Sequence, residues 1–379
     1  METQTKPITQ EYKDYTDKYF LRARHILENE GINPIVRYQV FARQDIDALR
    51  GVDEAVDFIH ELAPNVKVYA LRDGQEYTAK EPIMKLEGRV QDLMELETVY
   101  LGIISGRLTG ELDFKAIRQN AREIRQAAEE KPLLYFAARH FGYWDDEQLA
   151  RICFEEGFQG ASTDAGARAW NAKGMGTVPH ALVLAINAYM DQNNIRGNPS
   201  VEAMNLFDKH IDKEIPRVML IDTYNREVSD TLEVAREVPN LNAVRIDTCG
   251  ENYTECSREG TLPRLDVHPK YLYGKGVTIK GVWTLRKLLD KNGLVDLGLV
   301  VSSGFNQDKT KAFMHADKVY QWMYAKPLFT AIGTGSIAKP IMTTSDIVAY
   351  YNEDTREWKS MSKVGRSEVH STKLQEVTK

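Results

Sequence analysis

The stretch Arg217-Val-Met-Leu-Ile-Asp222-Thr223-Tyr224 is a short apolar run that ends in polar groups. The pattern recurs in Ala243-Val-Arg245-Ile-Asp247-Thr248, in residues 297–306 and in residues 328–336, the last of which ends in a glycine-rich turn. Functional groups at the C-terminal ends of successive short strands, with helix-like stretches between them, are typical of an α/β barrel. We therefore expect an irregular α/β barrel over residues 129–336.

The segments on either side of this barrel differ from it in pattern. The first third predicts a mixed α+β domain over residues 1–128, with helices at 20–30, 45–62 and 92–104 and strands at 36–42, 66–71 and 82–88. The polar segment 337–379 carries Trp358 and Lys363-Val-Gly365-Arg366, which indicate that it packs back on the N-terminal domain. Its last residues, 370–379, are expected to fray.

Composition limits the function classes. The chain has 379 residues, enough for two domains, and its 42% hydrophobic and 27% charged residues are typical of a soluble globular protein. A net charge of -6 argues against a basic nucleic-acid-binding face. No apolar run approaches the ~20 residues that cross a bilayer, and the polar N-terminus is not that of a signal peptide. Three cysteines predict a reducing compartment, so we expect a cytoplasmic protein.

A histidine stands at an expected helix start. The stretch Gly176-Thr-Val-Pro179-His180-Ala-Leu182 leads into an apolar run, and a Thr and a Pro before such a run are helix-start signals. The positive end of the helix would lower the pKa of the imidazole and keep it neutral and nucleophilic near pH 7. The alternative is a partly buried structural histidine that caps a loop.

Read in order, several segments resemble the nicotinate phosphoribosyltransferases, which are type II phosphoribosyltransferases related to the nicotinamide and quinolinate enzymes. The resemblance is carried by Thr16-Asp17-Lys18-Tyr19, by residues 81–88, 97–98, 135–140, 160–163 and 176–182, and by Asp222-Thr223-Tyr224, residues 244–247, Ser303-Gly304 and Gly333-Thr334-Gly335. It implies transfer of the phosphoribosyl group of phosphoribosyl pyrophosphate to nicotinate in NAD salvage. The products are nicotinate mononucleotide and pyrophosphate, and ATP is hydrolysed through a phosphohistidine.

The resemblance also implies a site for the base. Phe136 stacks on the pyridine ring, and Arg139 binds its carboxylate or the phosphoribosyl oxygens, since Arg suits a planar carboxylate. Tyr19 closes the other face of the base from a second subunit, which implies a homodimer with a shared active site. Ser162 and Thr163 touch the base. The simpler alternatives are core packing for Phe136 and a surface position for Tyr19.

The remaining roles concern phosphates and the sugar. His180 is the phosphorylated residue and Asp222 its acid partner. Arg245 and Asp247 lie on the same side of one strand, where Arg245 binds a carboxylate or phosphate and Asp247 holds ribose hydroxyls or a magnesium-bound water. Mg²⁺ arrives with phosphoribosyl pyrophosphate and ATP. The cradle for the 5′-phosphate is formed by Ser303, Gly304, Gly333, Thr334 and Gly335. The alternatives are a structural ion pair and two ordinary turns.

Some features depart from the family pattern. Thr248-Cys249-Gly250-Glu251 replaces the usual Ser-Gly-Asp after the Arg245 strand. No cysteine follows Cys256, so the C-terminal zinc knuckle of some relatives is not expected and no zinc site is predicted. Two alternatives therefore stay open, namely the same fold acting on nicotinamide or quinolinate, and a barrel that binds nucleotide without turnover.

Overall fold

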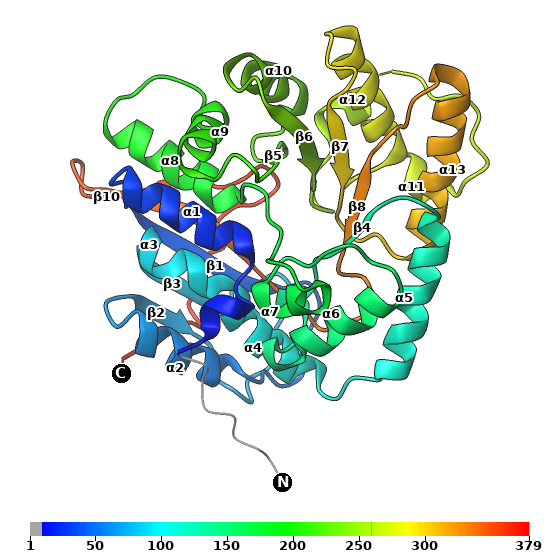
Figure 1. Ribbon diagram of the computed structural model, residues 1–379. Coiled ribbons are helices and arrows are strands. Elements are labelled where there is room, and N and C mark those ends of the chain that lie inside the picture. Colours follow the sequence, from blue (N-terminus) through cyan, green and yellow to red (C-terminus); the bar gives the residue numbers. More distant parts are fainter. Residues whose placement is uncertain (1–9, 259, 379) are drawn as a thin grey trace.

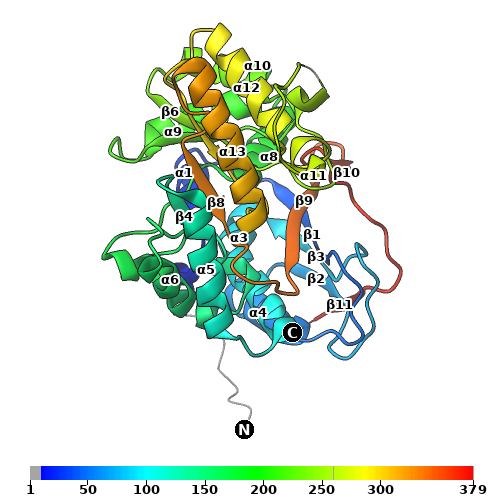
Figure 2. The same cartoon turned by 90° about the vertical axis from the view of Figure 1, so that its right-hand side faces the viewer.

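The computed structural model describes residues 10–258 and 260–378, which contain two sheets (Figures 1 and 2). One is a six-stranded antiparallel sheet in the order β10-β9-β1-β3-β2-β11, and the other is a five-stranded parallel sheet in the order β4-β8-β7-β6-β5. This α/β architecture confirms the predicted fold class. The domain limits proposed from the sequence stay predictions.

The antiparallel sheet joins the two ends of the chain. Its centre is β1 (Ile35–Ala42), which pairs with β3 (Met84–Arg89) on one side and β9 (Thr343–Asn352) on the other. The outer strands are β2 (Lys67–Ala70), β10 (Glu357–Ser360) and β11 (Gln375–Val377). Three of the six strands therefore come from the C-terminal segment, which packs back on the N-terminal part as expected. The associated helices are α1 (Lys18–Asn29), α2 (Val52–Leu62), α3 (Val90–Leu93) and α4 (Glu97–Thr109).

Three predictions for this part were wrong in detail. The helix expected over 45–62 begins only at Val52, because Gly51 has a φ of 79° and the Asp73 carboxylate accepts hydrogen bonds from the N–H groups of Gly51 and Val52. The helix expected over 92–104 is divided, with a 3₁₀ turn (Met94–Leu96) between α3 and α4. The segment 370–379 does not simply fray, because β11 pairs with β2, although Lys379 lies outside the described residues.

The parallel sheet carries the strand ends on which the site depends. Its strands are β4 (Leu133–Tyr135), β5 (Arg217–Leu220), β6 (Leu241–Ile246), β7 (Gly298–Val301) and β8 (Ala331–Thr334). A single parallel bridge between Tyr135 and Ala161 extends the sheet beyond β4. Within the described ranges no strand joins this edge to β5, so the expected barrel is not closed by hydrogen bonds.

Helices surround the parallel sheet on its outer side (Figure 1). They are α5 (Phe114–Ala128), α6 (Asp146–Glu155), α8 (His180–Gln192), α9 (Pro199–His210), α10 (Glu227–Glu237), α12 (Ile279–Lys291) and α13 (Gln307–Tyr324), with the short α7 (Asp164–Ala167) and α11 (Pro269–Leu272). Helix α5 was not predicted from the sequence. No helix in the described part of the chain is both long and apolar enough to span a bilayer.

Candidate active site

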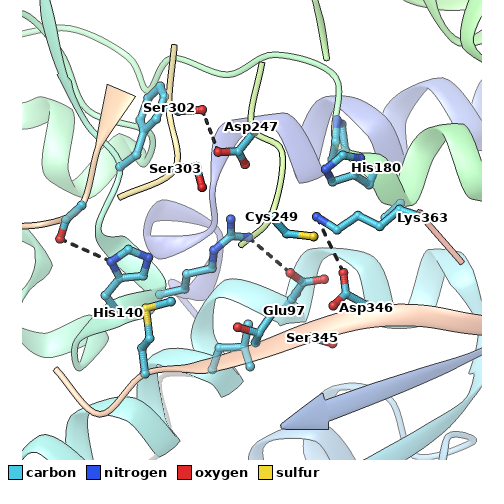
Figure 3. A pocket seen from close by; sticks show the side chains of 18 of the residues that line it. Glu97, His140, His180, Asp247, Cys249, Ser302, Ser303, Ser345, Asp346 and Lys363 are labelled. Atoms are coloured by element: carbon cyan, nitrogen blue, oxygen red, sulfur yellow. Dashed lines mark hydrogen bonds and ion pairs between the residues drawn. The ribbon is translucent and has the colours of Figure 1, made fainter. Parts of the chain in front are cut away.

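A cavity of about 400 Å³ lies where the strand ends of the parallel sheet face β9 of the antiparallel sheet (Figure 3). Ten of the residues predicted for the site line it: Tyr19, Phe136, Arg139, His180, Arg245, Asp247, Ser303, Gly304, Gly333 and Gly335. Polar groups at the carboxyl ends of parallel strands thus converge, as the strand pattern predicts.

His180 is the first residue of α8 and follows Pro179, so the predicted helix start is confirmed. Its Nδ1 lies 2.9 Å from the Thr223 hydroxyl, and its Nε2 lies 3.4 Å from an Asp222 oxygen. Burial and the charge of Lys363 lower the pKa of His180, outweighing Asp222, which raises it. The imidazole is therefore neutral near pH 7, and its Nε2 has no hydrogen-bond partner among the described residues.

Asp222 contacts His180 but does not itself line the cavity. It is 3% exposed, and its Oδ1 accepts no hydrogen bond from the described residues. Although burial opposes ionisation, His180, Lys363 and Arg245 hold the pKa of this carboxyl below its usual value. The structure therefore places an ionised carboxylate beside a neutral imidazole.

Another part of the cavity carries an arginine that contacts both a tyrosine and a carboxyl group. Arg139 donates a hydrogen bond of 2.8 Å to the Tyr19 hydroxyl and lies 3.4 Å from Glu97. Tyr19 is buried in its own chain and lines the cavity of that chain. The cause is the start of α1, where the Lys18 N–H donates to the Ser162 carbonyl and Gly176 leaves room for the Tyr19 backbone.

Arg245 and Asp247 form the predicted pair on one strand end. Arg245 donates to Asp247 at 3.1 Å and to the Ser302 hydroxyl at 2.9 Å. Ser302 in turn donates to Asp247 at 2.7 Å (Figure 3). The guanidinium carbon of Arg245 lies 5.0 Å from the centre of the Phe136 ring, within the range of a cation–π contact. The cavity therefore joins a planar apolar face to a fixed cation.

The two turns need glycine for different reasons. A Cβ on Gly333 would lie 2.3 Å from the Phe136 ring, and one on Gly335 would lie 2.4 Å from His140, so both glycines make room for neighbouring rings. Ser303 and Gly304 instead have φ values of 77° and 69°. A positive φ at a non-glycine residue such as Ser303 is strained, and such strain is typical of functional sites.

Besides Asp222, three predicted residues lie outside the cavity. The Thr163 hydroxyl accepts from the Gly166 N–H and donates to Asp146 at 2.6 Å, so it caps α7. Ser162 is buried and contributes its carbonyl to the start of α1. The Thr334 hydroxyl donates to the Phe305 carbonyl and accepts from the Ser336 N–H. All three stabilise loops, which corrects their assignment to the site.

The wall that faces the strand ends was missed. It comes from β9, α4, the end of β1 and the C-terminal turn, and its polar members are Arg43, Glu97, Ser345, Asp346, Lys363 and Arg366. On the side of the strand ends, His140 after β4 and Cys249 after β6 also line the cavity without having been assigned to the site. Burial raises the pKa of Glu97 to about 8, and burial with the charge of Arg139 lowers the pKa of His140 to about 4. Both groups are largely neutral at pH 7. The sequence feature that could have indicated this wall was the turn Lys363-Val-Gly365-Arg366.

Comparisons with known proteins agree with this architecture. Residues 17–106 match the family described as "Quinolinate phosphoribosyl transferase, N-terminal domain". Nicotinate phosphoribosyltransferase 1 of Arabidopsis thaliana is 30% identical over 141 residues, which cover 36% of this chain and 24% of that protein. Nicotinate phosphoribosyltransferase of Bacillus subtilis (strain 168) is 24% identical over 246 residues, which cover 63% of this chain and 40% of that protein. The chain thus matches less than half the length of these curated relatives.

Solved structures extend the likeness over nearly the whole chain. Nicotinate phosphoribosyltransferase from Porphyromonas gingivalis has a TM-score of 0.63 at 13% identity, covering 97% of this chain and 95% of that one. The protein of the same name from Vibrio cholerae has a TM-score of 0.60 at 13% identity, covering 93% and 90%. At this identity the likeness shows the fold, and together with the sequence matches it confirms the resemblance.

Proposed function

We propose that this chain, a relative of the nicotinate phosphoribosyltransferases, transfers the phosphoribosyl group of phosphoribosyl pyrophosphate to nicotinate. The observation that carries the proposal is that one cavity joins an aromatic face, two arginines, a strained Ser303-Gly304 turn and a neutral histidine. A planar anionic base needs the aromatic face and the arginines, and phosphates need the turn.

In the proposed reaction the pyridine nitrogen attacks the anomeric carbon, the bond to pyrophosphate breaks, and nicotinate mononucleotide forms. Phe136 and Tyr19 flank the base, and Arg139 and Arg245 bind its carboxylate. Ser303 and Gly304 hold the 5′-phosphate through backbone N–H groups. These residues act by positioning and by stabilising the charge that develops.

His180 links the reaction to ATP in this proposal. Its neutral Nε2 attacks the γ-phosphorus of ATP, the bond to the β-phosphate oxygen breaks, and ADP leaves. Asp222, 3.4 Å away, stabilises the positive charge that the ring gains. Hydrolysis of the phosphohistidine then drives synthesis.

Magnesium fits this site only together with substrate phosphates. The described residues hold no cluster of three or more metal-binding side chains, whereas Asp222 keeps one free oxygen near the cavity. Mg²⁺ commonly takes one or two carboxylates plus phosphate oxygens and waters. Asp222 or Asp247 would hold it together with phosphate oxygens, and it would neutralise charge on the leaving pyrophosphate. We propose no zinc site, a cytoplasmic location and a homodimer, the last to be checked by light scattering.

Product formation tests the activity. Phosphoribosyl pyrophosphate and Mg²⁺ are incubated with nicotinate, nicotinamide or quinolinate, each with and without ATP, alongside His180→Ala. We expect nicotinate mononucleotide, formed faster with ATP, and loss of the ATP response in the variant. Turnover of another base would overturn the assignment of nicotinate, and no turnover despite binding would support a non-catalytic binder.

A further inference from the structure

The turn Lys363-Val-Gly365-Arg366 is docked on the loops of the parallel sheet. The Val364 N–H donates to the Thr223 carbonyl at 2.9 Å, directly after Asp222. Gly365 has a φ of 87°, and a Cβ there would lie 2.8 Å from Asn252 and 3.0 Å from Cys249. A larger residue would therefore force the turn away, so its place beside the strand ends is built into the sequence.

This turn carries a lysine whose ion pair with Asp346 is long. Lys363 is 9% exposed and lines the cavity, and its ammonium nitrogen lies 4.0 Å from Asp346, too far for a hydrogen bond. Asp346 already accepts a 2.8 Å hydrogen bond from Arg366. The Lys363 ammonium donates no hydrogen bond to any described residue. Because the ammonium group lines the cavity and its carboxylate partner is distant, it can bind an anionic ligand that enters there.

The ammonium group and His180 face the same space. Figure 3 shows the end of Lys363 between His180 and Asp346, directed into the cavity. The charge of Lys363 is the largest influence on the pKa of His180 after burial, which agrees with this proximity. His180 Nε2 also lacks a hydrogen-bond partner. A cationic and a nucleophilic group thus lie close together, each with a carboxylate as a partner.

We propose that Lys363 binds the phosphate oxygens of the polyphosphate that reacts beside His180, so that the C-terminal turn completes an anion site begun by the parallel sheet. The inference rests on the proposed function and adds a substrate-binding residue to it. Lysine binds phosphate as a point charge. It would also offset the repulsion between an incoming phosphate and the carboxylates of Asp222 and Asp346.

The test compares Lys363→Met, Lys363→Arg and Lys359→Met. Lys359 lies on the same C-terminal segment but is exposed and paired with Asp191, so it serves as the matched control. Calorimetric titration with pyrophosphate and with phosphoribosyl pyrophosphate, each with Mg²⁺, measures anion affinity. We expect about tenfold weaker binding for Lys363→Met, corresponding to loss of about 1.4 kcal/mol. Lys363→Arg should recover most of that loss, and Lys359→Met should match wild type.

A second measurement separates binding from a structural role. Removal of the Lys363 charge should raise the pKa of His180, which can be measured by NMR of its ring protons. The KM for nicotinate should change by less than about twofold, well below the tenfold change that corresponds to about 1.4 kcal/mol. If Lys363→Met unfolds, Lys363→Gln gives the same comparison. Wild-type affinity for both ligands in Lys363→Met would overturn this inference alone. Absence of binding to the wild-type protein would overturn the proposed function as well.

Discussion

Replacement of Glu97 by Gln should stabilise the protein, and the gain should grow with pH. Glu97 is 4% exposed, and its one hydrogen bond within the described residues is the 3.4 Å contact with Arg139. Burial raises the pKa of this carboxyl from 4.5 to about 8, against the pull of Arg139 and Lys363 and with the help of Asp346 and Asp17. Glutamine has nearly the same shape and does not ionise.

The direction of this pH dependence follows from which state, folded or unfolded, loses the Glu97 proton at lower pH. The unfolded chain ionises Glu97 near pH 4.5, whereas the folded protein keeps the proton until about pH 8. The unfolded state is therefore favoured increasingly as pH rises between these values, and the effect levels off above pH 8. Between pH 5 and pH 8 the wild type should lose ~3 kcal/mol of stability through this one group.

Scanning calorimetry at pH 5, 6.5 and 8 checks this expectation. The melting temperature of Glu97→Gln should exceed that of the wild type by a margin that widens with pH. Glu61→Gln, at an exposed position on α2, should follow the wild type at every pH. A margin that stays constant from pH 5 to pH 8 would refute the reasoning, because it would mean that Glu97 is ionised in the folded protein throughout.

Three further changes probe other parts of the site. Gly333→Ala should push its Cβ against Phe136 and reduce the stability of the fold by about 1–3 kcal/mol. It should also raise the KM for nicotinate without weakening pyrophosphate binding, and an unchanged KM would contradict the role of that ring. Thr163→Val should cost about 1 kcal/mol through loss of the helix cap and leave the KM unchanged, whereas a raised KM would return Thr163 to the site. Although burial opposes it, Arg366 lowers the pKa of Glu251 to about 2, so Glu251→Gln should reduce the melting temperature at pH 7. The reduction should be smaller near pH 3, because there the carboxyl of the unfolded wild type binds a proton while that of the folded wild type stays largely ionised. An equal deficit at both pH values would argue against the ion pair.

One wall of the site could be predicted from the sequence, and the reason is geometric. Parallel strands bring their carboxyl ends to one edge, so apolar runs ending in Asp247 or Ser303 identify that edge without knowledge of strand order. His180 followed from local helix-start signals in the same way. Position near a strand end was not sufficient for Thr163, because a short helix begins there and takes the hydroxyl as its cap.

The other wall could not be predicted from local pattern. Glu97, Asp346 and Lys363 meet the strand ends because β9 pairs with β1, in a register that places Asp346 opposite Gln39. Periodicity indicates that a strand exists but does not say which distant strand it joins. The same limit explains β11, whose three residues are too few to show a period and which is held by pairing with β2.

The position of β9 has a consequence for how the protein is made. A ribosome synthesises β1 early and β9 only after the whole parallel sheet. Until then, the N–H and C=O groups along one edge of β1 have no strand to pair with. Such an edge can pair with other chains, and pairing between distant segments forms slowly. A premature stop after residue 336 would leave every strand of the parallel sheet present beside that open edge, and we expect such a product to aggregate before it can bind anything.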